Sequence, residues 1–379
     1  MHPGQETLAR LAPGLAATRA DPSLARHLPG ELYCSPEIYA LEKSRIWMTH
    51  WLSVGRVEEL PNVGDYKTLT ITDESIVVTR SGAEEFSVFM NQCLHRGAEL
   101  AAGCGHVKDF SCPYHAWLYG VDGRLIAAPG MKACKVDLSG ARLRPLQQRI
   151  WRGWIFVNFS DSPPPFEDFI APFETHLWWF RTEQCRTAST VVMNVKCNWK
   201  FLVENLIDIY HVGVIHASSF GGFVKSSDGL PFQLERGGGW HVRYEARPHD
   251  KSGRQVFPTL PWAEQESSSI ACKAGIYPNL NLSMRADSLR MWHVWPRSVA
   301  ETQIVCYLLF PQAAFEIPDF QGELERYRAF VAQIVTEDSA MVESLQRSAT
   351  SGFFRPGPMS PLEQALYHME NHYLDVMQA

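Results

Sequence analysis

The chain has 379 residues, of which 45% are hydrophobic and 20% are charged, and its formal net charge is −6. These values predict a full hydrophobic core in two or three domains, and they exclude a strongly basic surface for nucleic acid. The sequence has neither a run of eighteen apolar residues nor a secretory signal pattern at its start. We therefore expect a cytoplasmic protein with no membrane partner. The nine cysteines lack disulfide-framework spacing, which agrees with a reducing compartment.

Two segments with different patterns open the chain. Residues 1–43 are predicted to form a helical lead-in that packs on the carboxy-terminal domain and ends in a helix at 36–42. From 44 to 160, short β-branched and aromatic runs alternate with turn residues, which is typical of an all-β domain. The clearest strands are predicted at 66–71, 76–79, 86–90 and 154–159.

Three consecutive prolines, Pro163 to Pro165, mark the start of a third segment, 161–379, which mixes strands with helices. Strands are predicted at 187–195, 241–246, 288–295 and 302–310. Helices are predicted at 199–212, 322–348 and 361–376, with a Gly/Ser-rich loop at 218–239. Long strands with a long late helix predict an α+β architecture, in which a curved antiparallel sheet grips helices.

Two short loops in the all-β segment each offer one thiol and one imidazole, Cys93 with His95 and Cys112 with His115. Sixteen residues separate His95 from Cys112. A zinc finger more usually places two cysteines on one loop and two histidines further along. One ligand of each kind per loop allows two sulfurs to hold one iron and two nitrogens to hold the other. That is the ligand set of a Rieske 2Fe–2S cluster, with a zinc ribbon as the alternative.

A second polar group lies in the helix predicted at 199–212. Glu204, Asp208 and His211 recur at spacings of four and three, which places them on one helical face. His216 follows five residues after His211, so it must approach from the helix end. Two histidines and a carboxylate form the facial triad of mononuclear iron sites, and ordinary core histidines are the alternative.

The late helix at 322–348 supplies the candidate carboxylate, Asp338. Ile334, Asp338, Met341 and Leu345 are spaced by four, three and four residues, so Asp338 is expected within an apolar stripe. A carboxylate among aliphatic side chains is costly unless it is paired or binds metal. A partly exposed aspartate on a surface helix is the alternative.

These motifs resemble the Rieske non-haem iron oxygenases, in particular the α subunits of aromatic-ring-hydroxylating oxygenases. The resemblance rests on the two cluster loops, on the segment from Asn198 to His216 and on Asp338, and it covers nearly the whole chain. Ala116 departs from it, since glycine is common at this position. The resemblance implies a Rieske domain at 44–160, followed by a helix-grip (START/Bet v1-like) catalytic domain at 161–379.

The family resemblance also implies an assembly and an electron path. The subunits would form an α3 homotrimer, or an α3β3 complex with a small subunit. Asp208 would connect cluster ligand His115 of one subunit with His211 of the next, and a metal-bound imidazole commonly donates its second N–H to a carboxylate. Electrons from NAD(P)H would arrive through a separate reductase or ferredoxin, pass the cluster and reach Fe(II).

The implied activity is that of a terminal mono- or dioxygenase that uses O2 to hydroxylate an aromatic or other cyclic small molecule, as in aromatic hydrocarbon catabolism. An alternative is a Rieske monooxygenase that removes N- or O-methyl groups, including those of quaternary amines. The third possibility is an electron carrier without catalysis, although it leaves the second metal motif unexplained. The identity of Asp208 favours hydroxylation of a ring compound over demethylation of a quaternary amine, because quaternary-amine enzymes of this family more often have glutamate there.

Three residues are predicted to line a mainly apolar substrate pocket. Leu206 and Phe220 flank the ligand helix, and His293 lies on a strand that alternates apolar and polar residues.

Further residues are candidates for charged parts of a substrate. Lys273, Arg285 and Arg290 can meet a carboxylate, and Trp292 with Trp295 can contribute to an aromatic cage around a cation. Solvated charges and core tryptophans are the alternatives.

Overall fold

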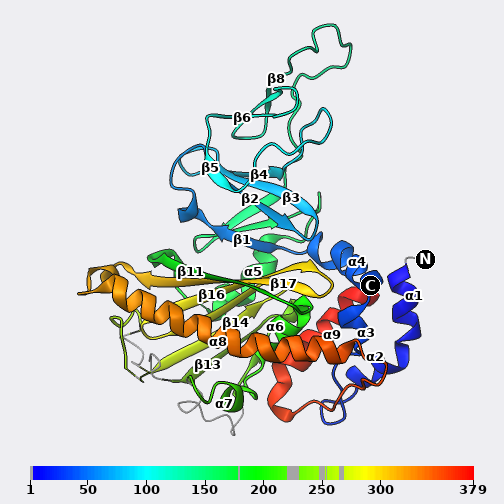
Figure 1. Cartoon of the computed structure of the whole chain (residues 1–379), viewed down its shortest axis with the longest axis vertical. Coiled ribbons are helices and arrows are strands. Elements are labelled where there is room, and N and C mark those ends of the chain that lie inside the picture. Colours follow the sequence, from blue (N-terminus) through cyan, green and yellow to red (C-terminus); the bar gives the residue numbers. More distant parts are fainter. Residues whose placement is uncertain (1–2, 178–179, 220–229, 247–251, 253, 264–268) are drawn as a thin grey trace. The chain divides into compact units, whose positions relative to one another are not determined.

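The computed structural model describes residues 3–177, 180–219, 230–246, 252, 254–263 and 269–379 (Figure 1). The chain divides into two compact units, one formed by Met1–Trp47 with Glu167–Ala379 and the other by Met48–Phe166. The lead-in therefore groups with the carboxy-terminal segment, and the predicted boundaries lie a few residues before those of the units. Among the described residues, no helix combines the length and the apolar character needed to cross a bilayer.

The unit formed by Met48–Phe166 is built from strands in three small antiparallel sheets. The first sheet contains β1 (Leu52–Arg56), β10 (Trp154–Asn158) and β9 (Gln147–Trp151). The second contains β4 (Phe86–Met90), β3 (Glu74–Arg80), β2 (Asp65–Ile71) and β5 (Cys104–His106). The third contains β6 (Asp109–Ser111), β7 (Leu118–Gly120) and β8 (Leu125–Ala127). The all-β prediction and its four strands are confirmed.

The larger unit contains a seven-stranded antiparallel sheet, which confirms the α+β prediction. Its order is β11-β17-β16-β15-β14-β13-β12. The strands are β11 (Cys185–Val195), β12 (Gln233–Leu234), β13 (Trp240–Glu245), β14 (Ile270–Ile276), β15 (Leu280–Arg285), β16 (Ser288–Ser298) and β17 (Glu301–Pro311). The short strand β12 lies inside the segment predicted as loop.

The helices of this unit complete the helix-grip arrangement. Helix α8 (Phe320–Ala349, orange in Figure 1) lies along the sheet, and α6 (Trp199–Ile207) packs against α8 and β16. The other helices are α1 (Pro3–Arg10), α2 (Ala12–Thr18), α3 (Glu31–Cys34), α4 (Pro36–Glu42), α5 (Phe166–His176), α7 (Val212–Ile215) and α9 (Gln364–Gln378). The predicted helices at 36–42, 322–348 and 361–376 are confirmed, the last beginning with a 3-10 turn at Pro361–Glu363.

A buried ion pair ties the lead-in to the catalytic segment. The carboxylate of Glu42, at the end of α4, is fully buried and accepts hydrogen bonds from Lys200 Nζ, Trp199 Nε1 (2.8 Å) and the Tyr373 hydroxyl (2.8 Å). Because a buried carboxylate requires several partners, these bonds fix α4 against α6 and α9.

Strand alternation sorts the sheet residues into two faces. Ser288, Arg290 and Trp292 share the face that α8 covers, because Ser288 Oγ lies 3.1 Å from the hydroxyl of Tyr327 on α8. His293 lies on the opposite face. This alternation decides which residues can reach the interior between the sheet and the helices.

Candidate metal centres

The two cluster loops share one backbone conformation. In the first, the Gly97 amide donates to the Cys93 carbonyl (2.8 Å), and in the second the Ala116 amide donates to the Cys112 carbonyl (3.0 Å). Gly97 and Ala116 both have positive φ, of 77° and 54°. Each cysteine amide also donates to the carbonyl five residues later. The loops are therefore two copies of one turn, and this explains why glycine suits the Ala116 position.

The side chains of these loops divide into a buried and an exposed pair. Cys93 and Cys112 are buried at 3% exposure, whereas His95 and His115 are exposed and their Nδ1 atoms lie 3.2 Å apart. Burial opposes ionisation of the Cys112 thiol, but hydrogen bonds from neighbouring backbone amides bring its pKa below the ordinary value. Two sulfurs on the protein side and two imidazoles on the solvent side fit a Rieske cluster.

Two aromatic residues outside the ligand set support this centre. The Tyr119 hydroxyl lies 3.2 Å from Cys93 Sγ and accepts a hydrogen bond from the Leu94 amide (3.0 Å). The rings of His95 and Trp117 are stacked, with centroids 5.1 Å apart. Trp117 belongs to the cluster motif, but the contact of Tyr119 depends on the β7 strand and has no sequence signal of its own.

The second centre brings His211, His216 and Asp338 together. Asp338 Oδ1 lies 3.0 Å from His216 Nε2 and 3.5 Å from His211 Nε2. Two ligand atoms that each lie about 2.1 Å from a metal, at roughly 90°, are about 3.0 Å apart. The donor set and its spacing thus fit a mononuclear iron bound by two imidazoles and one carboxylate.

A carboxylate orients each of these imidazoles through its other nitrogen. His211 Nδ1 lies 2.9 Å from Asp208 Oδ2, and His216 Nδ1 lies 2.8 Å from Glu337 Oε2. Such bonds fix the ring so that Nε2 faces the metal position. Burial would raise the pKa of Asp208, but the hydrogen bond with His211 and that from the Tyr210 amide lower it.

Several polar residues hold the carboxylates in turn. Glu337 accepts hydrogen bonds from Ser218 (3.0 Å), Ser219 (2.7 Å) and Gln333 (2.8 Å), while Asn205 donates to Asp338 (3.3 Å). The sequence showed Glu337 only as the neighbour of Asp338. Adjacent positions on a helix point about 100° apart, so its contact with His216 depends on where α7 lies.

The predicted helix at 199–212 is wrong in one respect, since α6 ends at Ile207 and Asp208 is extended (φ −63°, ψ 127°). Glu204 therefore does not share a face with Asp208 and His211. It is half-buried and accepts a hydrogen bond from the Tyr33 hydroxyl (2.8 Å). Burial, with a contribution from Glu370, raises the pKa of Glu204 to about 8.

The apolar stripe predicted around Asp338 is also wrong. Ile334 is buried, but Met341 is 44% exposed and Leu345 is 48% exposed. The side chain of Asp338 is 13% exposed, and it is held by polar partners rather than by aliphatic ones.

The three predicted pocket residues have different outcomes. Leu206 is half-buried near the end of α6, and Phe220 lies outside the described residues. His293 is buried on the sheet face opposite Arg290 and Trp292, where its ring contacts Trp295 and Tyr307.

The same alternation separates the two candidate cage residues. Trp292 shares the α8 face with Arg290, whereas Trp295 lies on the other face and contacts Trp47. The prediction of an aromatic cage formed by both tryptophans is therefore wrong, because residues three apart on a strand point in opposite directions.

The interior face of the sheet carries basic side chains next to the iron ligands. Lys273 pairs with Ser283, and Ser283 pairs with Arg290, so Lys273 and Arg290 point the same way. Arg285, two residues after Ser283, shares this face. Burial and the neighbouring arginines lower the pKa of Lys273 to about 8, although Asp208 and Asp338 oppose the shift.

A cavity lies between the two arginines of this face and α8. It is lined by Arg285, Asp287, Ser288, Arg290, Tyr327, Phe330 and Ile334. Ile334 lies one helical turn before Asp338 on α8, so the cavity extends toward the iron ligands. Arg285 Nη1 is buried and has no hydrogen-bond partner among the described residues.

Comparisons with known proteins agree with this site. Residues 182–379 match the family described as "Ring hydroxylating alpha subunit (catalytic domain)", and residues 50–144 match the Rieske 2Fe–2S domain. The chain is 26% identical over 365 residues to a glycine betaine monooxygenase oxygenase subunit of Pseudomonas aeruginosa, covering 88% of this chain and 84% of that protein. The catalytic-domain match excludes the interpretation as an electron carrier alone.

Two further relatives widen the range of chemistry. The chain is 30% identical over 242 residues to a carnitine monooxygenase oxygenase subunit of Acinetobacter pittii, covering 62% of this chain and 63% of that protein. Its fold matches naphthalene 1,2-dioxygenase from Rhodococcus sp. with a TM-score of 0.81 and 18% identity, over 99% of this chain and 98% of that one. Similar proteins therefore include both monooxygenases and dioxygenases.

Proposed function

The chain belongs to the family of ring-hydroxylating oxygenase α subunits, and from this premise we propose that its substrate is a small ring compound that carries a carboxylate. The protein is the terminal oxygenase of a Rieske system, with a 2Fe–2S cluster, a mononuclear iron and electrons from a reductase. The observation that carries the substrate assignment is the basic interior face formed by Lys273, Arg285 and Arg290.

We assign Cys93, His95, Cys112 and His115 to the cluster and His211, His216 and Asp338 to the iron. The cluster supplies single electrons, and the ferrous iron supplies O2 activation. The residues around the iron perform a different task. Asp208 and Glu337 hold the two imidazoles with Nε2 toward the metal, and Asn205 holds Asp338.

Asp208 is proposed to relay electrons between subunits of a homotrimer, with or without a β subunit. Its carboxylate already accepts a hydrogen bond from His211, and its side chain remains 19% exposed. The imidazoles of His95 and His115 face each other through Nδ1, which leaves Nε2 of the exposed His115 free to meet a carboxylate of another subunit.

The basic face supports an anionic substrate in three ways. Arg285 has a buried N–H donor without a partner among the described residues. Such a donor destabilises the protein unless a ligand accepts a hydrogen bond from it. No side chain in the described part of the chain forms an ion pair with Lys273. Arg290 lines the same cavity as Arg285, where a carboxylate can accept hydrogen bonds from both guanidinium groups.

A second candidate is demethylation of a quaternary amine, the chemistry of the glycine betaine and carnitine enzymes. Those substrates also carry a carboxylate, so the same basic face can bind that end. A basic interior repels their cationic end, however, and the cage expected from Trp292 and Trp295 does not form. The observations therefore favour a ring acid.

The test compares three groups of compounds with reconstituted enzyme and a surrogate reductase: aromatic and alicyclic acids, their uncharged analogues, and betaines. Substrate-stimulated O2 consumption and product mass are measured for each. We expect coupled hydroxylation of an acid, and a KM about tenfold or more higher in Arg290→Gln, because a charged hydrogen bond contributes about 1.5–3 kcal/mol. Arg297→Gln, on the same strand but bonded to Gln303, is the matched control.

Two results would contradict this proposal. Turnover of betaines with formaldehyde release and without ring hydroxylation would favour the second candidate. Equal KM values for an acid in Arg290→Gln, Arg285→Gln and the Arg297→Gln control would remove the basic face from substrate binding.

A further inference from the structure

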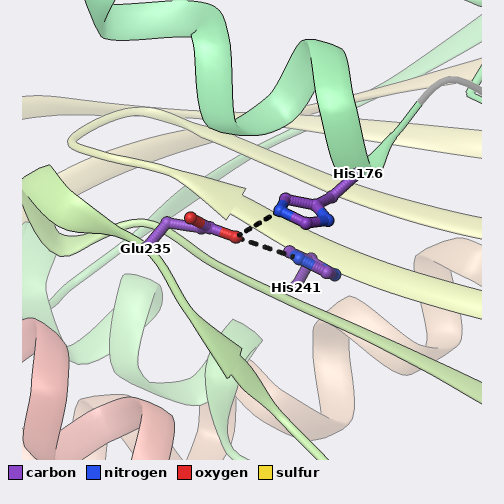
Figure 2. Close-up of side chains that lie close together, drawn as sticks. All are labelled: His176, Glu235 and His241. Atoms are coloured by element: carbon purple, nitrogen blue, oxygen red, sulfur yellow. Dashed lines mark hydrogen bonds and ion pairs between the residues drawn. The ribbon is translucent and has the colours of Figure 1, made fainter.

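Three metal-ligating side chains converge at a second place in the larger unit. Figure 2 shows the rings of His176 and His241 stacked on one side of the Glu235 carboxylate, with dashed lines from both rings to one of its oxygens. His241 Nε2 lies 3.1 Å from Glu235 Oε1, and His176 Nε2 lies 3.7 Å from the same atom. One ligand atom from each residue lies within 4.8 Å of the other two. None of these residues belongs to the cluster or iron motifs.

The three residues come from separate elements. His176 is the last residue of α5, Glu235 follows β12, and His241 is the second residue of β13. The β12–β13 hairpin pairs Leu234 with Trp240, and the Glu235 amide donates to the Gly239 carbonyl, so Glu235 and His241 are diagonal neighbours on one face of the hairpin. The cluster therefore joins the end of α5 to this hairpin.

The spacing fits a tetrahedral metal ion. Two ligand atoms that each lie about 2.1 Å from a metal at the tetrahedral angle are about 3.4 Å apart. The two measured N–O distances, 3.1 and 3.7 Å, lie on either side of this value. Two imidazoles and one carboxylate form a nitrogen–oxygen ligand set that zinc accepts, with a fourth position left for water.

The surroundings hold the ligands in place and leave an entry path. The Glu235 amide donates to the Gly239 carbonyl (2.8 Å), and the Glu235 carbonyl lies 2.7 Å from His368 Nε2 on α9. The side chains of His241 and Glu235 are only 9% and 15% exposed, whereas that of His176 is 49% exposed. A metal ion can thus enter past His176 into a site whose other two ligands are fixed.

We propose that His176, Glu235 and His241 bind one zinc ion, which fastens the end of α5 to the β12–β13 hairpin. The role is structural, because the ion would join ligands from α5, the turn after β12 and β13, and none of them belongs to the iron centre. It does not depend on the proposed substrate.

A hydrogen-bonded His–Glu pair with a neighbouring ring is the simpler explanation for this cluster. Such a pair needs only one histidine, as His106 and Asp65 illustrate at 2.8 Å in the other unit. At Glu235, two imidazoles aim at the same oxygen, and their rings are nearly parallel with centroids 5.0 Å apart. His176 Nε2, at 3.7 Å, lies beyond hydrogen-bond distance of that oxygen, so the His241–Glu235 pair does not account for its position, whereas a metal ion accepts a lone pair from each ring.

The experiment measures zinc bound by the iron-loaded full chain after equilibrium dialysis against buffered Zn²⁺, with iron and zinc determined together by mass spectrometry. Because zinc can replace the mononuclear iron, each measurement is repeated in a His216→Ala background. We expect one zinc per chain in that background, and none after Glu235→Gln or His176→Ala. His106→Ala is the control and should keep the zinc. His176→Ala changes a half-exposed helix end, so it tests the site without disturbing the buried core.

A second measurement tests the structural role. Added Zn²⁺ should raise the unfolding temperature of the His216→Ala chain and leave that of its Glu235→Gln derivative unchanged, since ligand binding to the folded state stabilises it. If the His216→Ala chain with all three proposed ligands intact bound no more zinc than its Glu235→Gln derivative, the proposal would be overturned. Equal zinc content in the Glu235→Gln, His176→Ala and His106→Ala variants would also overturn it.

Discussion

Glu337 provides the sharpest test of how the iron site is supported. Its two carboxylate oxygens accept four hydrogen bonds: Oε2 from His216 Nδ1 (2.8 Å) and Ser219 (2.7 Å), and Oε1 from Ser218 (3.0 Å) and Gln333 (2.8 Å). His216 Nδ1 must be the donor to Glu337, because Nε2 faces the metal position and has to remain unprotonated to bind the metal. Glu337→Gln keeps one acceptor oxygen for His216 but removes the charge, whereas Glu337→Ala removes the acceptor altogether.

Replacing a carboxylate that orients a metal-bound histidine typically weakens metal affinity by about 10–100-fold. We therefore expect the affinity for the mononuclear iron to fall about tenfold in Glu337→Gln and about a hundredfold in Glu337→Ala. The measurement is iron retained during dialysis against a graded chelator series, with the visible spectrum of the cluster as an internal control. The cluster spectrum should not change, since its ligands belong to the other unit.

Glu343→Ala is the matched control for this series. Glu343 lies on the same helix and accepts a hydrogen bond from the Lys196 amide (3.1 Å), away from the iron ligands. Equal iron retention in Glu337→Ala and Glu343→Ala would refute the reasoning, because the carboxylate would then contribute nothing to the orientation of His216.

Three further predictions concern the relay, the cluster loop and pH. Asp208→Asn should still bind iron at saturating Fe(II), and its cluster should still be reducible. The product of a single turnover should fall at least about a hundredfold, because the relay loses its charged acceptor. A near-native product yield would contradict the proposed relay. Ala116→Gly should stabilise the cluster unit by about 0.5–1 kcal/mol. Alanine in the left-handed conformation costs about 1–2 kcal/mol, and the greater conformational entropy of glycine in the unfolded chain cancels part of the gain. The midpoint of urea unfolding, followed by visible circular dichroism, measures this change, and an unchanged midpoint argues against it. Burial lowers the pKa of His27, but Glu370 and other carboxylates raise it to about 9; its stabilisation is therefore full below about pH 6.5 and lost as the pH rises through about 9. The difference in unfolding temperature between the native chain and His27→Gln should shrink over that window, and a constant difference would exclude the effect.

The β segments could be predicted because their signal is local. Alternation of apolar and polar residues with turn residues between them identified β2, β3, β4 and β10, and the long antiparallel strands β11, β16 and β17. The ligand sets could also be predicted, since loops with one cysteine and one histidine and a paired-histidine motif have few other uses. The structure brings His211, His216 and Asp338 together as the sequence suggested.

Orientation across elements could not be predicted in the same way. Met341 and Leu345 share a periodic stripe with Ile334, yet both are about half exposed, because this part of α8 packs through another face, which carries Val342, Gln346 and Ala349. His293 has the residue type of a pocket ligand, but strand register turns it to the other face. Periodicity gives the faces of an element, and only packing decides which face meets the site.

The break after α6 shows why helical periodicity failed where the function lies. Had the helix continued through His211, the extended backbone at Asp208 would be lost, and with it the turn in which the Tyr210 amide donates to Asp208 Oδ1 (2.6 Å) while His211 Nδ1 meets Oδ2 (2.9 Å). Asp208 ends the helix, holds the first imidazole and stays partly exposed, a combination that a regular helical position does not provide. His216 then reaches Asp338 from the end of the short helix α7. The local preference for a continuous helix is overruled by these polar contacts, which only the broken chain can form, and departures of this kind are expected at functional sites.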